Sequence, residues 1–212
     1  MENSYKIVPI NKINNLSVVI LAAGISERME GFYKPLLPFN NGCNFLEQIV
    51  KIYTQFKVNE IIIVVNKTVY SKLDLILYKK HNIHIEVNPY PEKGRFYSII
   101  LGVSKVLHSN YCFLQNVDNP FVTNELLSTL VKNKTDLGYA VPYFNNEGGH
   151  PIIISKAIIR YLQNEKNYFL NLKNILRTFK KVKVQVDDKN ILVNINSITD
   201  YKNYFELTNV NY

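Results

Sequence analysis

Cysteine is scarce in this chain of 212 residues, which has only Cys43 and Cys112. The two lie far apart and show neither a CxxC pair nor the spacing of zinc ligands, which speaks against a disulfide framework and a zinc site. Long hydrophobic runs are also missing, since none approaches the roughly 18 residues that a membrane-spanning helix needs. The opening stretch MENSYKIVPINKINN is too polar for a signal peptide. We therefore expect a soluble, cytoplasmic protein with no membrane partner.

Acidic residues are outnumbered, with 17 Asp and Glu against 25 Lys and Arg, a net charge of +8 and a pI near 9.3. A dense basic block is nevertheless absent, because the cations are spread along the chain. This distribution favours small anionic ligands over nucleic acid. Nucleic-acid binding remains an alternative, suggested by the charge and the fifteen tyrosines. It predicts a steep salt dependence of oligonucleotide binding.

Internal repeats, Pro-rich linkers and low-complexity blocks are absent, so nothing divides the chain into separate domains. With 47% hydrophobic residues it is long enough to bury one sizeable core. We expect a lead-in over residues 1–15 and one domain over residues 16–212, as a monomer or homodimer.

Short β-branched runs alternate along the chain with apolar residues at helical spacing, a pattern typical of parallel strands joined by crossover helices. Strands are predicted at Ser17–Ala22, Glu60–Val65, His84–Val87, Tyr111–Asn116, Gly138–Tyr143, Pro151–Ile154 and Val182–Val186. Helices are predicted at Asn44–Phe56, Tyr70–His81, Tyr97–His108, Asn124–Lys132, Lys156–Gln163, Leu170–Phe179 and Ile198–Leu207. The fold class is therefore α/β.

Unusual segments follow three of these strands, and ligands of an open α/β sheet bind outside the carboxyl ends of its strands. The segments are LAAGISER, NPYPEKGRFYS and NVDNP, and a fourth, NNEGGHP, lies between two later strands. We expect all four to meet at one site.

The stretch VVILAAGISERMEGFYKPLLPF carries the strongest chemical signal. Ala22, Ala23 and Gly24 leave backbone N–H groups unshielded, so that they can approach phosphate oxygens. Arg28 offers a planar fork suited to phosphate, and Lys34 a point charge. The stretch matches neither the P-loop nor the GxGxxG fingerprint. On these residues alone, a tight turn beside two solvated cations is an equally good interpretation.

The same stretch resembles the signature of molybdenum-cofactor-type nucleotidyltransferases, LAAGxSxRMGxxKxLLP, the MobA-like NTP transferases. Gly24, Ser26, Arg28, Met29 and Lys34 stand at matching positions, while Glu30 lengthens the Arg-to-Lys interval by one residue. The resemblance implies a three-layer, Rossmann-like fold of the nucleotide-diphospho-sugar transferase (GT-A-like) type, with a mostly parallel mixed sheet. It also implies that one loop wraps a triphosphate, with Arg28 and Lys34 as catalytic phosphate contacts and with binding residues Leu21, Ala22, Ala23, Gly24 and Ser26.

Two further segments extend the resemblance. NVDNP is similar to the family's GDxP motif, which implies that Asp118 is a catalytic residue that binds Mg²⁺, a cation that prefers oxygen ligands. Taken alone, a DNP stretch is more typical of a turn, with Asp118 as the cap before Pro120. GRFYSIILGV resembles GxxxSLxxG and implies that Gly94 and Ser98 contact the nucleotide base.

The remaining resemblances concern the acceptor and the metal. EGGHP is similar to the region near which the acceptor binds, which implies roles for Gly149, His150 and Pro151. His150 could act as a general base, but an acceptor phosphate is already ionised, so we favour a positioning role. LVNINSITDY follows the family's DxDTPEDY segment with both aspartates replaced, by Asn194 and Asn196. Asn196 remains a candidate metal ligand through its carbonyl oxygen.

The resemblance thus implies a Mg²⁺-dependent transfer of a nucleoside monophosphate from CTP or GTP to a phosphorylated small-molecule acceptor, with release of pyrophosphate. CMP transfer of the molybdenum cofactor cytidylyltransferase type is favoured. The alternatives are guanylyl transfer, suggested by the two asparagines, and sugar-phosphate or alcohol-phosphate acceptors. A glycosyltransferase is disfavoured because VDN stands where its DxD motif would be. A nucleotide sensor without turnover is the alternative outside the enzymes.

Overall fold

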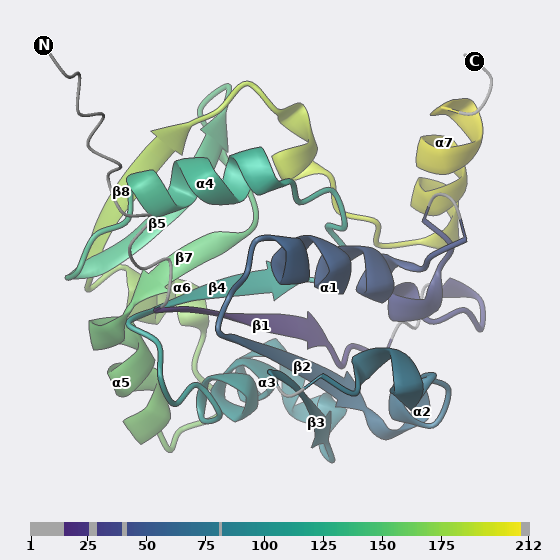
Figure 1. Ribbon diagram of the computed structural model, residues 1–212, viewed down its shortest axis with the longest axis horizontal. Helices are drawn as coiled ribbons and strands as arrows, with labels where there is room; N and C mark the ends of the chain where they lie inside the picture. Colours follow the sequence, from purple (N-terminus) through teal and green to yellow (C-terminus); the bar gives the residue numbers. More distant parts are fainter. Residues whose placement is uncertain (1–14, 26–28, 40–41, 81, 209–212) are drawn as a thin grey trace, which may run out of the picture.

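An eight-stranded sheet organises the part of the chain that the computed structural model describes, residues 15–25, 29–39, 42–80 and 82–208 (Figure 1). The strand order is β3-β2-β1-β4-β7-β5-β6, with β8 beside β5. The strands are β1 (Leu16–Ala22), β2 (Glu60–Asn66), β3 (Ile83–Asn88), β4 (Tyr111–Asn116), β5 (Gly138–Phe144), β6 (Glu147–Gly148), β7 (Ile152–Ser155) and β8 (Lys180–Gln185).

Most of this sheet is parallel. β1 pairs in parallel with β2 and β4, β2 with β3, and β5 with β8. β7 runs antiparallel to β4 and β5, and the two-residue strand β6 runs antiparallel to β5. The expected mostly parallel mixed sheet is confirmed. All seven predicted strands exist, each within two residues of its predicted ends, and only β6 was not expected.

Helices cover both faces of the sheet, with α1 and α4 on one face and α3 and α5 on the other (Figure 1). The helices are α1 (Phe45–Gln55), α2 (Lys67–Tyr70), α3 (Gly94–Val103), α4 (Asn124–Lys132), α5 (Lys156–Asn164), α6 (Leu172–Leu176) and α7 (Ile198–Thr208). Short 3-10 turns are η2 (Lys34–Leu36), η3 (Leu75–Tyr78), η4 (Pro91–Lys93) and η5 (Lys189–Leu192). Within the described residues, no helix is both long and apolar enough to cross a membrane.

Side chains of the central strands alternate between two hydrophobic cores, as the period of a strand requires. Val18 and Ile20 of β1 join the core under α1 and α4, whereas Val19 of the same strand joins the core under α3 and α5. The second core is tight. A Cβ atom at Gly102 of α3 would lie 2.4 Å from Cγ1 of Val19, so only glycine lets this helix approach β1 so closely.

The predicted helix Tyr70–His81 is wrong. The chain instead forms α2, which ends at Tyr70, and the separate 3-10 turn η3. Asp74 starts that turn, because its side chain accepts a hydrogen bond from the backbone N–H of Ile76 at 3.0 Å. Ile76 is 72% exposed, so this apolar segment has no buried face to stabilise a longer helix. Residue 81 itself lies outside the described residues.

Two other helices differ in extent from the prediction. α6 spans only Leu172–Leu176 instead of Leu170–Phe179, because Asn171 caps it by accepting from the N–H of Lys173. α3 begins at Gly94, three residues before the predicted start, and ends at Val103, five residues before the predicted end. This early start brings Gly94 and Arg95 into the first turn of α3, at the edge of the sheet where β1 and β4 end.

Candidate active site

A pocket of about 430 Å³ opens at the carboxyl ends of β1 and β4. Its lining brings together most of the residues that the sequence motifs single out, from segments far apart in the chain. These are Leu21, Ala22, Ala23, Gly24, Lys34, Gly94, Ser98, Asp118 and Asn196. Ser26 and Arg28 lie outside the described residues. Asn194 does not line the pocket, and its side chain donates instead to the carbonyl of Leu192 at 3.1 Å.

The turn after β1 presents bare backbone to this pocket. A Cβ atom at Gly24 would meet no atom of the other described residues within 4 Å, so packing against them does not require glycine there. Its effect is instead to leave the main chain open to a ligand. Asn66, at the end of β2, holds the turn by donating to the carbonyls of Gly24 at 3.1 Å and Ala23 at 3.4 Å.

The additional residue before Gly31 is accommodated by a tight turn. Glu30 and Gly31 both have positive φ, 51° and 89°, and the N–H of Phe32 donates to the carbonyl of Met29 at 2.8 Å. Met29 is fully buried, which fixes where this turn begins. The chain then enters η2, which carries Lys34.

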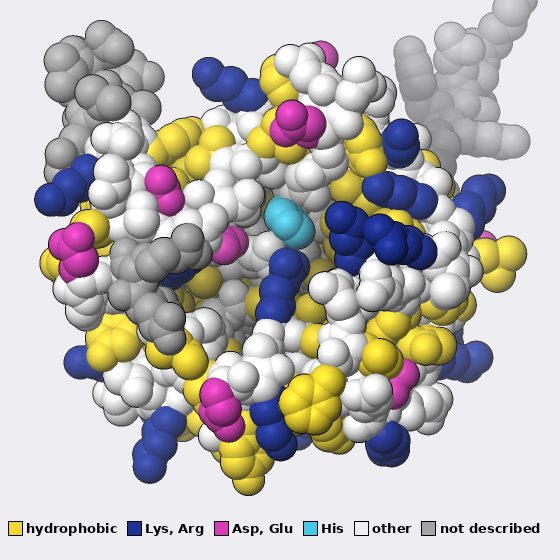
Figure 2. Space-filling view, turned by 180° about the vertical axis from the view of Figure 1, so that it is seen from behind, with side chains coloured by type: hydrophobic (Ala, Val, Ile, Leu, Met, Phe, Trp, Pro, Cys, Tyr) yellow, Lys and Arg dark blue, Asp and Glu magenta, His cyan; other side chains and the backbone are white. Residues whose placement is uncertain are grey.

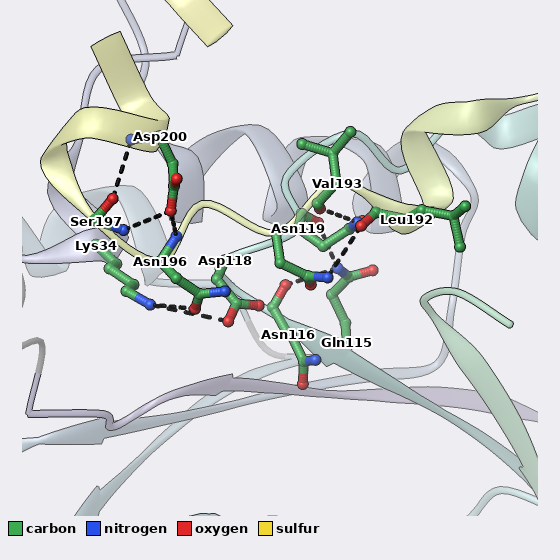
Figure 3. A network of polar contacts seen from close by, with 11 residues as sticks. Lys34, Gln115, Asn116, Asp118, Asn119, Leu192, Val193, Asn196, Ser197 and Asp200 are labelled. Atoms are coloured by element: carbon green, nitrogen blue, oxygen red, sulfur yellow. Dashed lines mark hydrogen bonds and ion pairs between the residues drawn. The ribbon is translucent and has the colours of Figure 1, made fainter. Parts of the chain in front are cut away.

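Lys34 points into the pocket from η2. Its Nζ donates to Oδ1 of Asn196 at 2.9 Å and lies 4.0 Å from Oδ2 of Asp118 (Figure 3). The side chain thus joins the signature loop, the loop after β4 and the segment before α7. The one-residue insertion therefore leaves the Lys34 ammonium beside the Asp118 carboxylate.

The loop after β4 is held by two buried amides. Nε2 of Gln115 donates to the carbonyls of Asn116 and Asn119, both at 2.8 Å. Nδ2 of Asn119 donates to the carbonyls of Asn190 at 3.1 Å and Ile191 at 3.3 Å. It also donates to the carbonyl of Val193 (Figure 3).

The same loop is tied to the segment that carries Asn196. The N–H of Ile195 donates to the carbonyl of Asp118 at 2.8 Å, so the backbone next to Asn196 is bonded to the backbone of Asp118. The positions of the two candidate metal ligands are therefore coupled by backbone as well as by side-chain contacts.

The carboxyl group of Asp118 is in an environment that suits a cation. Burial raises its pKa above the usual value, and the positive charges of Lys34 and Arg95 oppose that rise. Its Oδ1 is buried and has no hydrogen-bond partner among the described residues. Asp118 and Asn196 provide oxygen donors, and a magnesium ion commonly takes only one or two protein carboxylates and fills its shell with phosphates and water. No group of three or more His, Cys, Asp or Glu with metal-site geometry occurs within the described part of the chain.

Ser98 and Arg95 enter the pocket from α3. Ser98 is buried, and its Oγ accepts a hydrogen bond from Nδ2 of Asn88 at 2.9 Å. Burial lowers the pKa of the Arg95 guanidinium and the nearby Asp118 opposes this, but arginine remains charged in proteins. From the sequence alone, Arg95 was not a candidate site residue. Its position between Gly94 and Ser98, two residues of a recognisable motif, was the available signal.

A second, larger pocket of about 890 Å³ adjoins the first, and Gly94 and Arg95 line both. Gly149 and His150 form part of its wall, whereas Pro151 is buried and is not among the lining residues. A Cβ atom at Gly149 would lie 2.3 Å from the carbonyl oxygen of Ile191, so this position requires glycine. The N–H of His150 donates to that same carbonyl at 3.0 Å.

The His150 imidazole is neutral at ordinary pH. Burial, and to a smaller extent the positive charge of Arg95, lowers its pKa to about 4. Its Nδ1 is buried without a hydrogen-bond partner within the described residues. A neutral imidazole with an unused nitrogen can accept or donate a hydrogen bond to a ligand in the larger pocket.

Comparison with known proteins agrees with this geometry. The model of the MobA-like NTP transferase domain matches residues 18–182. A molybdenum cofactor cytidylyltransferase of Escherichia coli (strain K12) is 28% identical over 186 residues, which are 88% of this chain and 93% of the relative. A probable molybdenum cofactor guanylyltransferase of Clostridium perfringens (strain SM101 / Type A) is 25% identical over 195 residues, 92% of each chain.

Solved structures show the same fold. The crystal structure of Rv0371c from Mycobacterium tuberculosis H37Rv superposes with a TM-score of 0.74 at 19% identity, covering 91% of this chain and 99% of that one. A manganese complex of Rv0371c gives a TM-score of 0.71 at 16% identity, with the same coverage of both chains. The family match spans well over half of the sequence. The chain therefore belongs to the MobA-like NTP transferase family and is a nucleotidyltransferase.

Proposed function

We propose that this nucleotidyltransferase transfers CMP from CTP to a small-molecule acceptor that carries a phosphate. In this reaction an acceptor phosphate oxygen forms a bond to the α-phosphorus, the bond between the α-phosphorus and the bridging oxygen breaks, and pyrophosphate leaves. The observation that carries the proposal is the pair of adjoining pockets, one with the signature loop and one with His150, that share Gly94 and Arg95. Such an arrangement suits a two-substrate reaction that depends on positioning and charge neutralisation.

In this proposal the nucleotide occupies the smaller pocket. Its triphosphate lies against Gly24 and Lys34, with Arg28 from the same loop, and its base lies near Gly94 and Ser98. Asp118 and Asn196 would hold a divalent metal, for which we propose Mg²⁺, and this ion would neutralise charge on the phosphates. Arg95 faces both substrates and stabilises the phosphate charge between them.

The acceptor occupies the larger pocket. His150 is neutral, and its Nδ1 has no hydrogen-bond partner among the described residues. It positions the acceptor by a hydrogen bond and does not act as a base, because a phosphate is already ionised at neutral pH. The preference for CTP is supported by the Escherichia coli relative, which is named as a cytidylyltransferase. GTP is the second candidate, favoured by the name of the Clostridium relative and by the asparagines at positions 194 and 196.

A thermal-shift screen of the four NTPs with Mg²⁺ tests the nucleotide part of the proposal. A ligand that binds only the folded state at a hundred times its Kd stabilises it by about 2.7 kcal/mol. CTP should raise the melting temperature most, and the effect should disappear when EDTA replaces Mg²⁺. A larger shift with GTP would select the second candidate, and no shift with any NTP would overturn the proposal.

Two variants sharpen the screen. Lys34→Gln should abolish most of the CTP shift and, once an acceptor is known, lower the rate of pyrophosphate release by about a hundredfold or more. Lys51→Gln is the matched control, because it removes the same charge from an exposed position of α1. An unchanged shift in Lys34→Gln would contradict the role given to this side chain.

A further inference from the structure

The larger pocket has a second group of cations, away from the wall that it shares with the nucleotide pocket. Five Lys and Arg residues line it: Lys93, Arg95, Lys173, Arg177 and Lys181. No Asp or Glu is among the described lining residues. The basic group of Lys173, Arg177 and Lys181 comes from the segment of α6 and β8, and none of its members lines the nucleotide pocket. In the view of Figure 2, Lys and Arg side chains gather beside the histidine that is visible there.

Local structure explains why these three side chains converge. Lys173 and Arg177 are four residues apart at α6, a spacing that places them on one face of the helix, while Ile175 and Leu176 are buried in the core. Lys181 follows in β8, where Val184 is buried and Lys181 and Lys183 face the opposite side. β8 runs in register with β5, so Lys181 is directly beside Tyr139 of the pocket wall.

The charge of the basic group is not neutralised within the described part of the chain. None of its three members forms an ion pair with a carboxylate there. Lys181 Nζ donates to the hydroxyl of Tyr143 at 2.6 Å and lies 5.0 Å from the centre of its ring, and Arg177 donates to Oδ1 of Asn174 at 3.4 Å. These partners are uncharged, so an anionic group of a ligand could pair with the three cations without displacing a carboxylate of the described residues.

The lining of this pocket also includes apolar and aromatic side chains. Val141, Leu170 and Phe179 contribute to it, together with Tyr139 and Tyr168. Its volume of about 890 Å³ lies within the range of about 300–1,000 Å³ that is usual for small-molecule sites. The pocket can therefore hold a ligand that has an apolar or aromatic part as well as charged groups.

We propose that the acceptor carries a second anionic group, on the side of its apolar body away from the attacking phosphate, and that Lys173, Arg177 and Lys181 bind that group. This inference rests on the proposed function, because it names the class of acceptor for the same reaction. The attacking phosphate lies at Arg95, on the wall shared with the nucleotide. The second group, a carboxylate or another phosphate, lies at the basic group and sets the orientation of the acceptor.

Matched naphthyl phosphates test this proposal directly. Three probes carry on the far ring a carboxylate, a second phosphate or a neutral carboxamide. The chain contains no tryptophan, so naphthalene fluorescence can be read against a low protein background in a titration of the full-length protein. The carboxylate or the second phosphate should bind about tenfold more tightly than the carboxamide, and the tighter of the two identifies the preferred anion.

Arg177→Gln and Lys181→Gln should remove most of this preference while leaving the affinity for the carboxamide probe within about twofold. Lys132→Gln, an exposed lysine of α4 outside the pocket, removes the same charge and should keep the preference. Equal binding of the three probes to the wild type would overturn the proposal. So would a preference that survives in both pocket variants.

The rise in melting temperature caused by CTP distinguishes a failure of the acceptor proposal from a failure of the proposed function. If CTP still raises the melting temperature of the wild type and both variants, a missing preference refutes the anionic acceptor alone. If no NTP stabilises the wild type, the proposed function fails and the acceptor proposal, which rests on it, fails as well.

Discussion

His150 is a half-buried imidazole whose ionisation opposes folding. In the unfolded chain its pKa is near 6.5, whereas in the folded protein burial and the charge of Arg95 lower it to about 4. Between these values the unfolded chain binds a proton that the folded protein does not. The contribution of His150 to the free energy of unfolding is therefore fully present above pH 6.5 and falls as the pH drops towards 4.

This difference predicts how the wild type and a variant respond to acid. The free energy of unfolding of His150→Gln, measured with urea at about pH 7 and about pH 4.5, should fall less than that of the wild type, by an amount of the order of 2–3 kcal/mol. His108→Gln, at an exposed position, should fall as much as the wild type. An identical fall in all three proteins would contradict the assignment.

At the scale of single elements, Asn119 is the side chain that joins the loop after β4 to the segment around η5. The amide of Asn119 donates to three backbone carbonyls of the segment that begins in η5, at Asn190, Ile191 and Val193. It is 1% exposed, so water cannot replace these bonds without a change in packing. Asn119 therefore joins the strand end that carries Asp118 to the segment that leads to Asn196.

Removing that amide should lower the stability of the protein. We expect Asn119→Ala to lower the free energy of unfolding by about 1–3 kcal/mol, because the Val193 carbonyl loses its amide donor. The carbonyls of Asn190 and Ile191 lose the amide as well but still accept from the backbone N–H groups of Val193 and His150. Asn133→Ala removes an exposed amide that bonds only to its own helix, and should change stability by less than about 0.5 kcal/mol in the same urea titration. Equal effects of the two substitutions would show that the loop does not depend on Asn119.

The accuracy of the sequence predictions also differed from element to element. The strands β1, β2 and β4 were predictable because they are short apolar runs and nearly all of their residues are buried, on both faces of the sheet. The failure over Tyr70–His81 has a physical cause, since the apolar spacing of Leu75, Ile76 and Leu77 resembles that of a buried helix although these side chains are exposed. No local pattern distinguishes an exposed apolar turn from a helix that packs on the core.

The site residues likewise include some that the sequence predicted and some that it did not. Lys34, Asp118 and Ser98 were found because they stand in contiguous motifs, and all three line one pocket. Asn119 escaped notice because its bonding partners lie more than seventy residues further along the chain. The basic group of α6 and β8 escaped notice for a related reason, because lysines and arginines in a chain with 25 of them form a site only where the fold brings them together.

At the scale of the whole molecule, the two hydrophobic cores share one sheet. β1 and β2 contribute alternate side chains to both cores, and β4 lies between β1 and β7. Loss of one core would therefore expose the opposite face of strands that the other core needs. This arrangement supports the proposal that residues 16–212 form one domain.

Urea unfolding tests that proposal. Far-ultraviolet circular dichroism and tyrosine fluorescence should give one transition with the same midpoint, as expected of a single cooperative unit. The fifteen tyrosines are spread along the chain, so the fluorescence reports on the whole molecule. Two resolved transitions, or midpoints that differ between the two signals, would show that the chain contains more than one independently unfolding part.

The left-handed turn at Glu30 and Gly31 has a consequence for how such proteins are detected. Because both residues adopt positive φ, one additional residue is accommodated without moving the Lys34 ammonium away from Asp118. The separation of Lys34 and Asp118 is thus set by the fold and not by the number of residues in the loop. A search pattern with a fixed interval between the arginine and the lysine would reject this chain, whereas a pattern that allows one insertion before the glycine would retain it.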